Sequence, residues 1–382
     1  MAAYHQMGHQ SDNLLTSDHL DKYSGCLLSP VNYKKSEIAA QIKNTTHRGL
    51  KSIFDPQFYY PKSERGQLKK WTYFPSDVDT ADLSSDTWWN AVIDGLVEAC
   101  EEIAPSAVCS PAIVPKKFDD DYFARLVQNG RRLAKQLKKS KITPVQTAVA
   151  GLADLATPKR SLAVASILSQ TEVEGIYLVF VGTTHPRREL SDVEEIKGAM
   201  RLISALKSAG LEVTVGFCSS DIVLWKAAGA AACATGKFFN LRRFTPSRFA
   251  EPAEGGGQLS YWFEEMLLAN LRESDLIRVK NKAMLSESSQ GNPFGTEILR
   301  LIETEPGAAW VGLGWRQFMH WFADIEERAH KNPDIVEELL LRAESGWKAL
   351  DDAKPRILME ERQNDGSWIR AWRRALLEYS SH

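Results

Sequence analysis

The segment KSIFDPQFYY, residues 51–60, contains the strongest candidate for chemistry in this sequence. Asp55 ends a short apolar run and is followed by a proline, a glutamine and three aromatic residues. A carboxylate at a strand end can stabilise an oxocarbenium-like cation or activate water, and flat rings can clasp a planar base. The alternative is that Asp55-Pro56 is a turn beside core aromatic residues. We predict that Asp55 is catalytic and that Gln57 and Tyr59 bind a base.

A second candidate is the basic segment GKFFNLRRFTPSR, residues 236–248, in which Lys237, Arg242 and Arg243 lie among three phenylalanines. A glycine and backbone amides after a late barrel strand commonly hold phosphate, and arginine pairs bind it bidentately. We predict that this segment lies on the rim of the site and binds a phosphate or a nucleic-acid backbone. The alternative is a solvated basic turn on a buried aromatic stem.

Weaker candidates follow other apolar runs. His185 in THPRREL is a potential base or phosphate contact, although a lone loop histidine is more often neither. Ser219, Ser220 and Asp221 either cap a helix or contribute to the site. Trp368 and Trp372, on one helix face, either pack against the barrel or bind DNA. The predicted site comprises the catalytic Asp55, the base-binding Gln57, Tyr59, Gln146 and Asp221, and the backbone-binding His185, Arg187, Lys237, Asn240, Arg242 and Arg243.

These side chains must be positioned by elements that alternate along the chain. Nearly continuous apolar runs, typical of parallel strands buried on both faces, lie at 25–31, 51–56, 106–114, 143–151, 175–182, 211–218 and 230–236. Segments with helical periodicity lie between them, for example 123–140 and 193–210. This order predicts a (β/α)8 barrel with its site at the C-terminal ends of the strands. We expect the barrel over 1–281, an insertion at about 69–104, and a helical region over 282–382.

Composition narrows the function classes. The chain has 382 residues, 43% of them hydrophobic, and a formal net charge of −2, so a basic surface for nucleic acid would have to be local. Its five cysteines form no CxxC pair, and neither GxGxxG nor a phosphate-binding GxxxxGK[ST] motif occurs. We therefore expect no metal and no cofactor. A polar start and the absence of an 18-residue apolar run predict a cytoplasmic protein without a membrane partner.

The order of segments from Tyr122 to Ala234 resembles the barrel of tRNA-guanine transglycosylases, which exchange a guanine for a 7-deazaguanine. FARLVQNGRRLAKQLKKSKITPVQTAVAGLADL is similar to a long helix, a strand and a short "DL" turn in that family. VEGIYLVFVG and LEVTVGFCSSDIVLWKAAGAAACAT are similar to its later strands and helices. IFDPQFY resembles the "TDSGGFQ" strand end, which implies that Asp55 is the base-site aspartate.

The chain departs from that family at three positions. The cysteine and histidine cluster that binds zinc has no counterpart, and Ala234 stands near the place of the nucleophilic aspartate. The glutamine of the base pocket corresponds either to Gln146 or, with a shifted alignment, to Ala150. A base pocket with one aspartate suits removal of a base by water better than exchange.

The resemblance therefore implies N-glycosidic bond hydrolysis in nucleic acid. The expected protein is a DNA glycosylase that excises a modified base, with phage DNA as a substrate in antiviral defence. One alternative is a transglycosylase that exchanges guanine for a 7-deazaguanine in DNA or tRNA. The others are a non-catalytic barrel that binds nucleic acid and a small-molecule enzyme that holds a substrate phosphate at residues 236–248.

Overall fold

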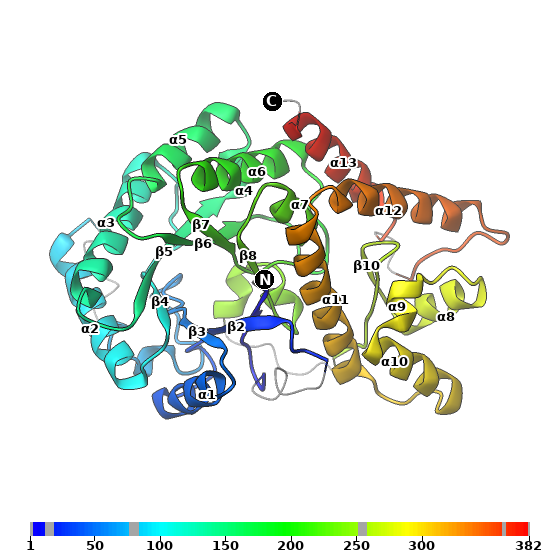
Figure 1. Cartoon of the computed structure of the whole chain (residues 1–382), viewed down its shortest axis with the longest axis horizontal. Coiled ribbons are helices and arrows are strands. Elements are labelled where there is room, and N and C mark those ends of the chain that lie inside the picture. The colour runs from blue at the N-terminus through cyan, green and yellow to red at the C-terminus, as the bar shows by residue number, and fades with distance from the viewer. Residues whose placement is uncertain (1–2, 12–18, 76–83, 251–257, 361–363, 381–382) are drawn as a thin grey trace.

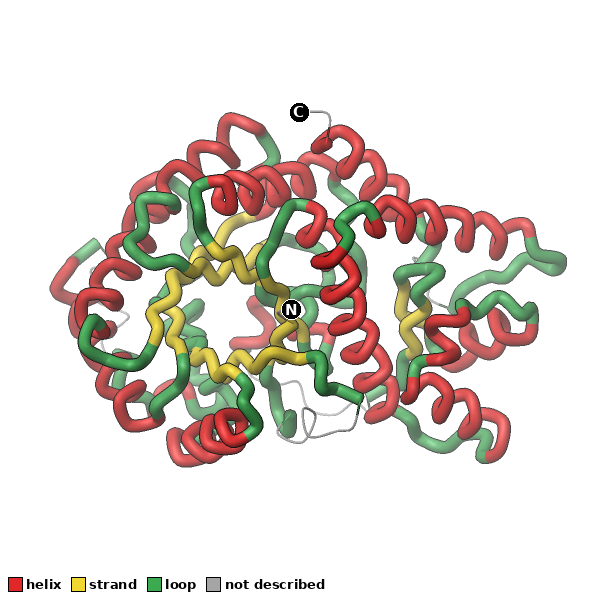
Figure 2. The backbone as a smooth tube through the Cα atoms, in the orientation of Figure 1, coloured by secondary structure: helices red, strands yellow, loops and turns green. Residues whose placement is uncertain are grey.

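Eight parallel strands close into a barrel, as the computed structural model shows for residues 3–11, 19–75, 84–250, 258–360 and 364–380 (Figures 1 and 2). Each strand pairs with the next, and the last pairs with the first, so that Tyr4 lies opposite Ala234. The (β/α)8 class expected from the sequence is thereby confirmed. The strands are β1 (Ala3–Gln6), β2 (Tyr23–Leu28), β3 (Lys51–Phe54), β4 (Ala107–Cys109), β5 (Thr143–Gly151), β6 (Gly175–Val181), β7 (Glu212–Val215) and β8 (Ala232–Thr235).

Seven of the eight strands overlap the apolar runs of the sequence, and β1 does not. Its residues AYHQ include two polar side chains, yet all four are buried. Gln6 is retained inside because its Oε1 accepts a hydrogen bond from the hydroxyl of Tyr177 on β6, at 3.2 Å. A strand that carries polar side chains into the barrel interior gives no continuous apolar signal in the sequence.

Helices cover the outside of the barrel, and their boundaries follow local capping chemistry. Asp119 caps α3 by accepting a hydrogen bond from the backbone N–H of Tyr122, and Asp192 caps α6 in the same way. An apolar stripe on α3 faces β5, while its charged residues face outward. The helices between the strands are α1 (Lys35–His47), α2 (Asp86–Ile103), α3 (Asp120–Leu137), α4 (Leu152–Leu155), α5 (Pro158–Leu168), α6 (Val193–Ser208) and α7 (Ile222–Ala227).

The insertion expected at about 69–104 is smaller than its tryptophan content indicated. Residues 86–103 form α2, the ordinary helix between β3 and β4, so only the loop that follows β3 is long. This loop includes a short 3-10 helix at Leu68–Lys70, and residues 76–83 fall outside the described part. Its rings pack on the end of β3, where Trp71 lies 5.2 Å from Phe54 between ring centroids.

The C-terminal region returns to the barrel. A hairpin of β9 (Trp262–Glu264) and β10 (Ala269–Leu271) leads into α8 (Glu273–Asn281), α9 (Glu287–Gly291) and α10 (Pro293–Thr304). Then α11 (Val311–Lys331) packs against α7, β1 and β8, where an eighth barrel helix belongs (Figure 1). The last helices, α12 (Ile335–Asp352) and α13 (Ser367–Ser380), pack against each other, and α13 covers α6. The expected boundary at 281 therefore falls before the last barrel helix.

Among the helices that the structure describes, none combines the length and apolarity that crossing a bilayer requires.

Candidate functional site

Asp55 lies immediately after β3, on the face of the barrel where the strands end. The residue is 1% exposed, and its carboxylate accepts hydrogen bonds from the backbone N–H of Gln57 at 2.9 Å and the hydroxyl of Tyr59 at 3.0 Å. Burial raises the pKa of this carboxyl group to about 6, although both hydrogen bonds and the nearby Arg248 favour the ionised form. Asp55 can thus change protonation near neutral pH, as a general base must.

Four residues surround Asp55 and complete a buried polar network, which we call the Asp55 cluster: Ser29, Gln57, Tyr59 and Arg248. The hydroxyl of Ser29 donates to the side-chain oxygen of Gln57 at 2.9 Å and accepts from Arg248 at 3.1 Å. Gln57 has a φ of 49°, a left-handed conformation that is uncommon for a residue other than glycine. Such strain persists where surrounding contacts fix it, often at functional sites.

Two members of the Asp55 cluster were not expected from the sequence. Ser29 follows β2, and Arg248 lies 193 positions after Asp55 in the segment after β8. The side-chain nitrogen Nε2 of Gln57 and the Nε of Arg248 find no hydrogen-bond partner among the protein groups described. Buried donors of this kind are expected to bind water or substrate.

Gln146 does not join the Asp55 cluster. It lies within β5, five positions before the end of that strand, and pairs with Ile176 of β6. Its side chain points at α3, where a Cβ atom added to Gly130 would approach the Gln146 side-chain oxygen to 2.7 Å. Adjacent strand residues face opposite sides, so this glutamine lies between the strand and the helix layer.

The basic segment after β8 is buried rather than on the rim, which corrects the prediction for Lys237, Arg242 and Arg243. Arg242 is 3% exposed, donates to the carbonyl of Gly236 at 3.0 Å and lies 3.5 Å above the ring of Phe318 on α11. Burial lowers the pKa of its guanidinium to about 9. Lys237 donates to the carbonyl of Gln10 and lies over the ring of Trp315. These cations hold the C-terminal region against the barrel.

Arg243 is paired with the buried carboxylate of Asp221 and the largely buried one of Glu189. It lies 3.3 Å from Asp221, which was expected to bind a base, and 3.3 Å from Glu189. Asp221 also accepts a hydrogen bond from the backbone N–H of Ser219, so it organises the turn that leads into α7. Burial raises the pKa of Glu189 to about 7 and Arg243 opposes that rise. No hydrogen bond or ion pair described in the structure joins this trio to Asp55.

Replacing Arg243 by methionine is expected to lower the free energy of unfolding by about 2 kcal/mol, because two buried carboxylates lose their cation. The salt dependence of DNA binding should stay unchanged, since Arg243 does not face solvent. Chemical denaturation and a binding series in salt measure the two quantities. If the salt dependence of DNA binding became weaker and stability did not fall, Arg243 would be a phosphate-binding residue on the rim of the site, as first predicted.

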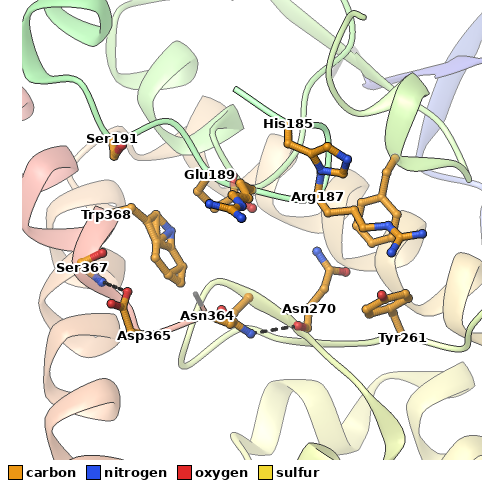
Figure 3. Close-up of a pocket in the computed structure, with 13 residues that line it drawn as sticks. His185, Arg187, Glu189, Ser191, Tyr261, Asn270, Asn364, Asp365, Ser367 and Trp368 are labelled. Carbon is orange, nitrogen blue, oxygen red and sulfur yellow. Dashed lines mark hydrogen bonds between the residues drawn. The ribbon is translucent and has the colours of Figure 1, made fainter. Parts of the chain in front are cut away.

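His185, Arg187 and Asn240 lie apart from the Asp55 cluster, around two neighbouring pockets. One pocket, of about 610 Å³, is lined by His185, Arg187 and Glu189 from the loop after β6, together with C-terminal residues (Figure 3). The other, of about 290 Å³, includes Asn240 and shares His185 and Arg187. The C-terminal lining residues Tyr261, Asn270, Asn364 and Trp368 come from distant segments, so no local pattern in the sequence identifies them.

Within the described ranges, no three histidine, cysteine, aspartate or glutamate side chains come together in a way that could hold a metal ion. The described cysteines are all buried, and none of them forms a disulfide in the described part of the chain.

No protein-family model and no curated protein matches this chain. The chain is similar in structure to an L-ribulose 3-epimerase, at 13% identity over 88% of this chain and 98% of that one, with a TM-score of 0.41. It is also similar to dihydrodipicolinate synthase from Oceanobacillus iheyensis, at 11% identity over 100% and 96% of the two chains, with a TM-score of 0.36. A third likeness is to the carboxyl transferase domain of Rhizobium etli pyruvate carboxylase. The identity is 10% over 97% of this chain and 60% of that one, with a TM-score of 0.40.

These likenesses agree with the (β/α)8 barrel and carry no argument about activity or substrate. The resemblance to tRNA-guanine transglycosylases therefore stays a prediction in everything except the barrel.

Proposed function

We propose that this protein is an enzyme that hydrolyses an N-glycosidic bond in nucleic acid, with DNA that carries a modified base as the substrate. The observation that carries the proposal is Asp55, a buried carboxylate at the C-terminal end of a barrel strand whose pKa is raised to about 6. Above that pH the carboxylate is ionised, and it can accept a proton or stabilise a developing positive charge.

The reaction needs few protein groups. Asp55 takes a proton from a water molecule, the water oxygen bonds to C1′ of the sugar, and the bond from C1′ to the base nitrogen breaks with its electrons going to the base. The base leaves after taking up a proton, and an abasic site remains. The Tyr59 hydroxyl orients the carboxylate, and Arg248 contributes positive charge through its contact with Ser29.

Hydrolysis is favoured over base exchange by the residue on β8. Ala234 is wholly buried in that strand, opposite Tyr4, and supplies no carboxylate for a covalent glycosyl intermediate. Exchange of guanine for a 7-deazaguanine is the second candidate because the family resemblance implies it.

Nucleic acid as the substrate is supported by exposed basic side chains in loops that follow strands. Lys116 and Lys117 follow β4, and Arg187 and Arg188 follow β6. Because these loops extend from the same face of the barrel as Asp55, they can bind phosphates around the site although the whole chain has a charge of −2. A role in cytoplasmic defence against phages with modified DNA is consistent with this substrate.

The test is to incubate the protein with DNAs that carry different base modifications, and with tRNA. Mass spectrometry of released base and detection of abasic sites measure hydrolysis, and labelled 7-deazaguanine measures exchange. Release of free base with an equal number of abasic sites supports the proposal. Incorporation of label without abasic sites would replace it by exchange, and binding without any release would make the barrel a non-catalytic binding protein.

A further inference from the structure

The pocket of about 610 Å³ lies between the barrel and the C-terminal region (Figure 3), and no member of the Asp55 cluster lines it. Its walls come from the loop after β6, from Phe239 of the segment after β8, from the β9–β10 hairpin with Tyr261 before it, and from residues at the start of α13. None of these lining residues belongs to the predicted catalytic group. Its volume is within the range of about 300–1,000 Å³ typical of small-molecule sites.

Aromatic side chains stand at both ends of this pocket. Figure 3 places Trp368 at one end and Tyr261 at the other, with Asn364 and Asn270 along the edge between them. Tyr261 packs edge-on against Phe239, with ring centroids 5.0 Å apart, so its position is fixed. Trp368 is 6% exposed, and its ring is likewise held in place by the tryptophan rings packed around it. Rings with carboxamides between them suit a flat, hydrogen-bonding ligand.

Charge is distributed unevenly along the pocket. Asp365 lies beside Trp368, whereas His185 and Arg187 lie towards Tyr261 (Figure 3). The positive end continues into the smaller pocket, which Lys237 and Arg242 also line. Glu189 stands between the two ends, and its pairing with Arg243 fixes its carboxylate in the wall. A ligand that fits must therefore present N–H donors to the carboxylates and an anionic group to the basic end.

We propose that this pocket binds one nucleotide, with a base that bears an amino group towards Trp368 and Glu189 and its phosphate towards Arg187 and His185. The base packs against the ring of Trp368 and donates to the carboxylate of Glu189, as cytosine donates from N4. The phosphate lies away from Asp365, which would repel it. A free nucleotide and a nucleotide within a single strand have the same chemistry at this site.

Isothermal titration calorimetry on the full-length protein with dCMP, deoxycytidine, dTMP and a single-stranded oligodeoxynucleotide tests the proposal. We expect dCMP to bind at least about tenfold more tightly than deoxycytidine, through the phosphate contact, and more tightly than dTMP. Arg187→Gln should remove the advantage of dCMP over deoxycytidine, and Asn364→Ala should weaken both, because Asn364 lies beside the position of the base. Arg370→Gln is the matched control, because Arg370 is exposed on α13 outside the pocket.

Tighter binding of the oligonucleotide than of dCMP, if Asn364→Ala also weakens it, identifies a strand as the source of the nucleotide, and equal binding identifies the free nucleotide. Equal binding of dCMP and deoxycytidine, or an unchanged dCMP affinity in Arg187→Gln, overturns the proposal. The same titration on Asp55→Asn should give wild-type affinity. The nucleotide-pocket proposal is thus tested by nucleotide affinity, whereas the glycosidase proposal is tested by base release, so one can fail without the other.

Discussion

Asp55→Asn is expected to lower the rate of base release at pH 7.5 by at least about 100-fold in single-turnover measurements. Asparagine keeps the size of the side chain and an oxygen that can accept from Gln57 or Tyr59. It lacks the charge that stabilises a cation and the basicity that takes a proton from water. Asp154→Asn, on α4 directly after β5, is the matched control and should retain activity.

The same substitution has an expected signature in stability. The folded-state pKa of Asp55 is about 6, above the ordinary aspartate value of 3.8, so the folded protein binds more protons between these two values. Wild-type stability therefore falls as the pH rises from about 4 to about 6, and this loss persists above pH 6. Asp55→Asn lacks this dependence. The free energy of unfolding of Asp55→Asn, minus that of the wild type, should therefore increase by up to about 3 kcal/mol between pH 4 and pH 6.

Wild-type activity should follow the ionisation of the same group and increase with pH through about 6. Denaturation curves at pH 4, 5, 6 and 7.5 and a pH–rate profile measure the two effects. Wild-type base release by Asp55→Asn would end the catalytic assignment, and a flat stability difference would show that Asp55 titrates normally.

The sequence predicted the barrel well because strands buried on both faces leave continuous apolar runs. Its one missed strand, β1, carries His5 and Gln6 into the interior, and only the fold shows that Tyr177 donates to Gln6. The insertion expected at about 69–104 includes α2, because that helix carries Trp88 and Trp89 and its sequence resembles part of an aromatic loop.

The candidate site was predictable only where it is local in sequence. Asp55, Gln57 and Tyr59 lie within five positions, so one turn brings them together. Ser29 and Arg248 join them through tertiary contacts alone.

The basic segment was misplaced for a related reason. A sequence shows that Arg242 and Arg243 are charged, but it does not show Phe318 or the carboxylates that make their burial favourable. Gln146 was misplaced for another reason. Moving a strand by one position exchanges the side chains on its two faces, and the sequence alone does not show on which face of β5 Gln146 lies.

A deeply buried ion pair joins the barrel to its C-terminal region. Lys226 on α7 lies 2.8 Å from Glu326 on α11, and their side chains are 2% and 1% exposed. Lys226 also donates to the carbonyl of Ala230, at 2.9 Å. The pair therefore connects α11, the last barrel helix, to α7, the short helix that precedes β8.

Lys226→Met is expected to lower the free energy of unfolding by about 3–5 kcal/mol, because it leaves the carboxylate of Glu326 buried without its cation. The double variant Lys226→Met, Glu326→Leu should recover most of this loss, since two apolar side chains replace both charges. Lys331→Met removes the partner of an exposed pair on the same α11 and should change stability by less than about 1 kcal/mol. Urea unfolding at pH 7.5 measures all three. A change below about 1 kcal/mol in Lys226→Met, or a double variant no more stable than the single one, would show that this pair does not fix α11 to the barrel.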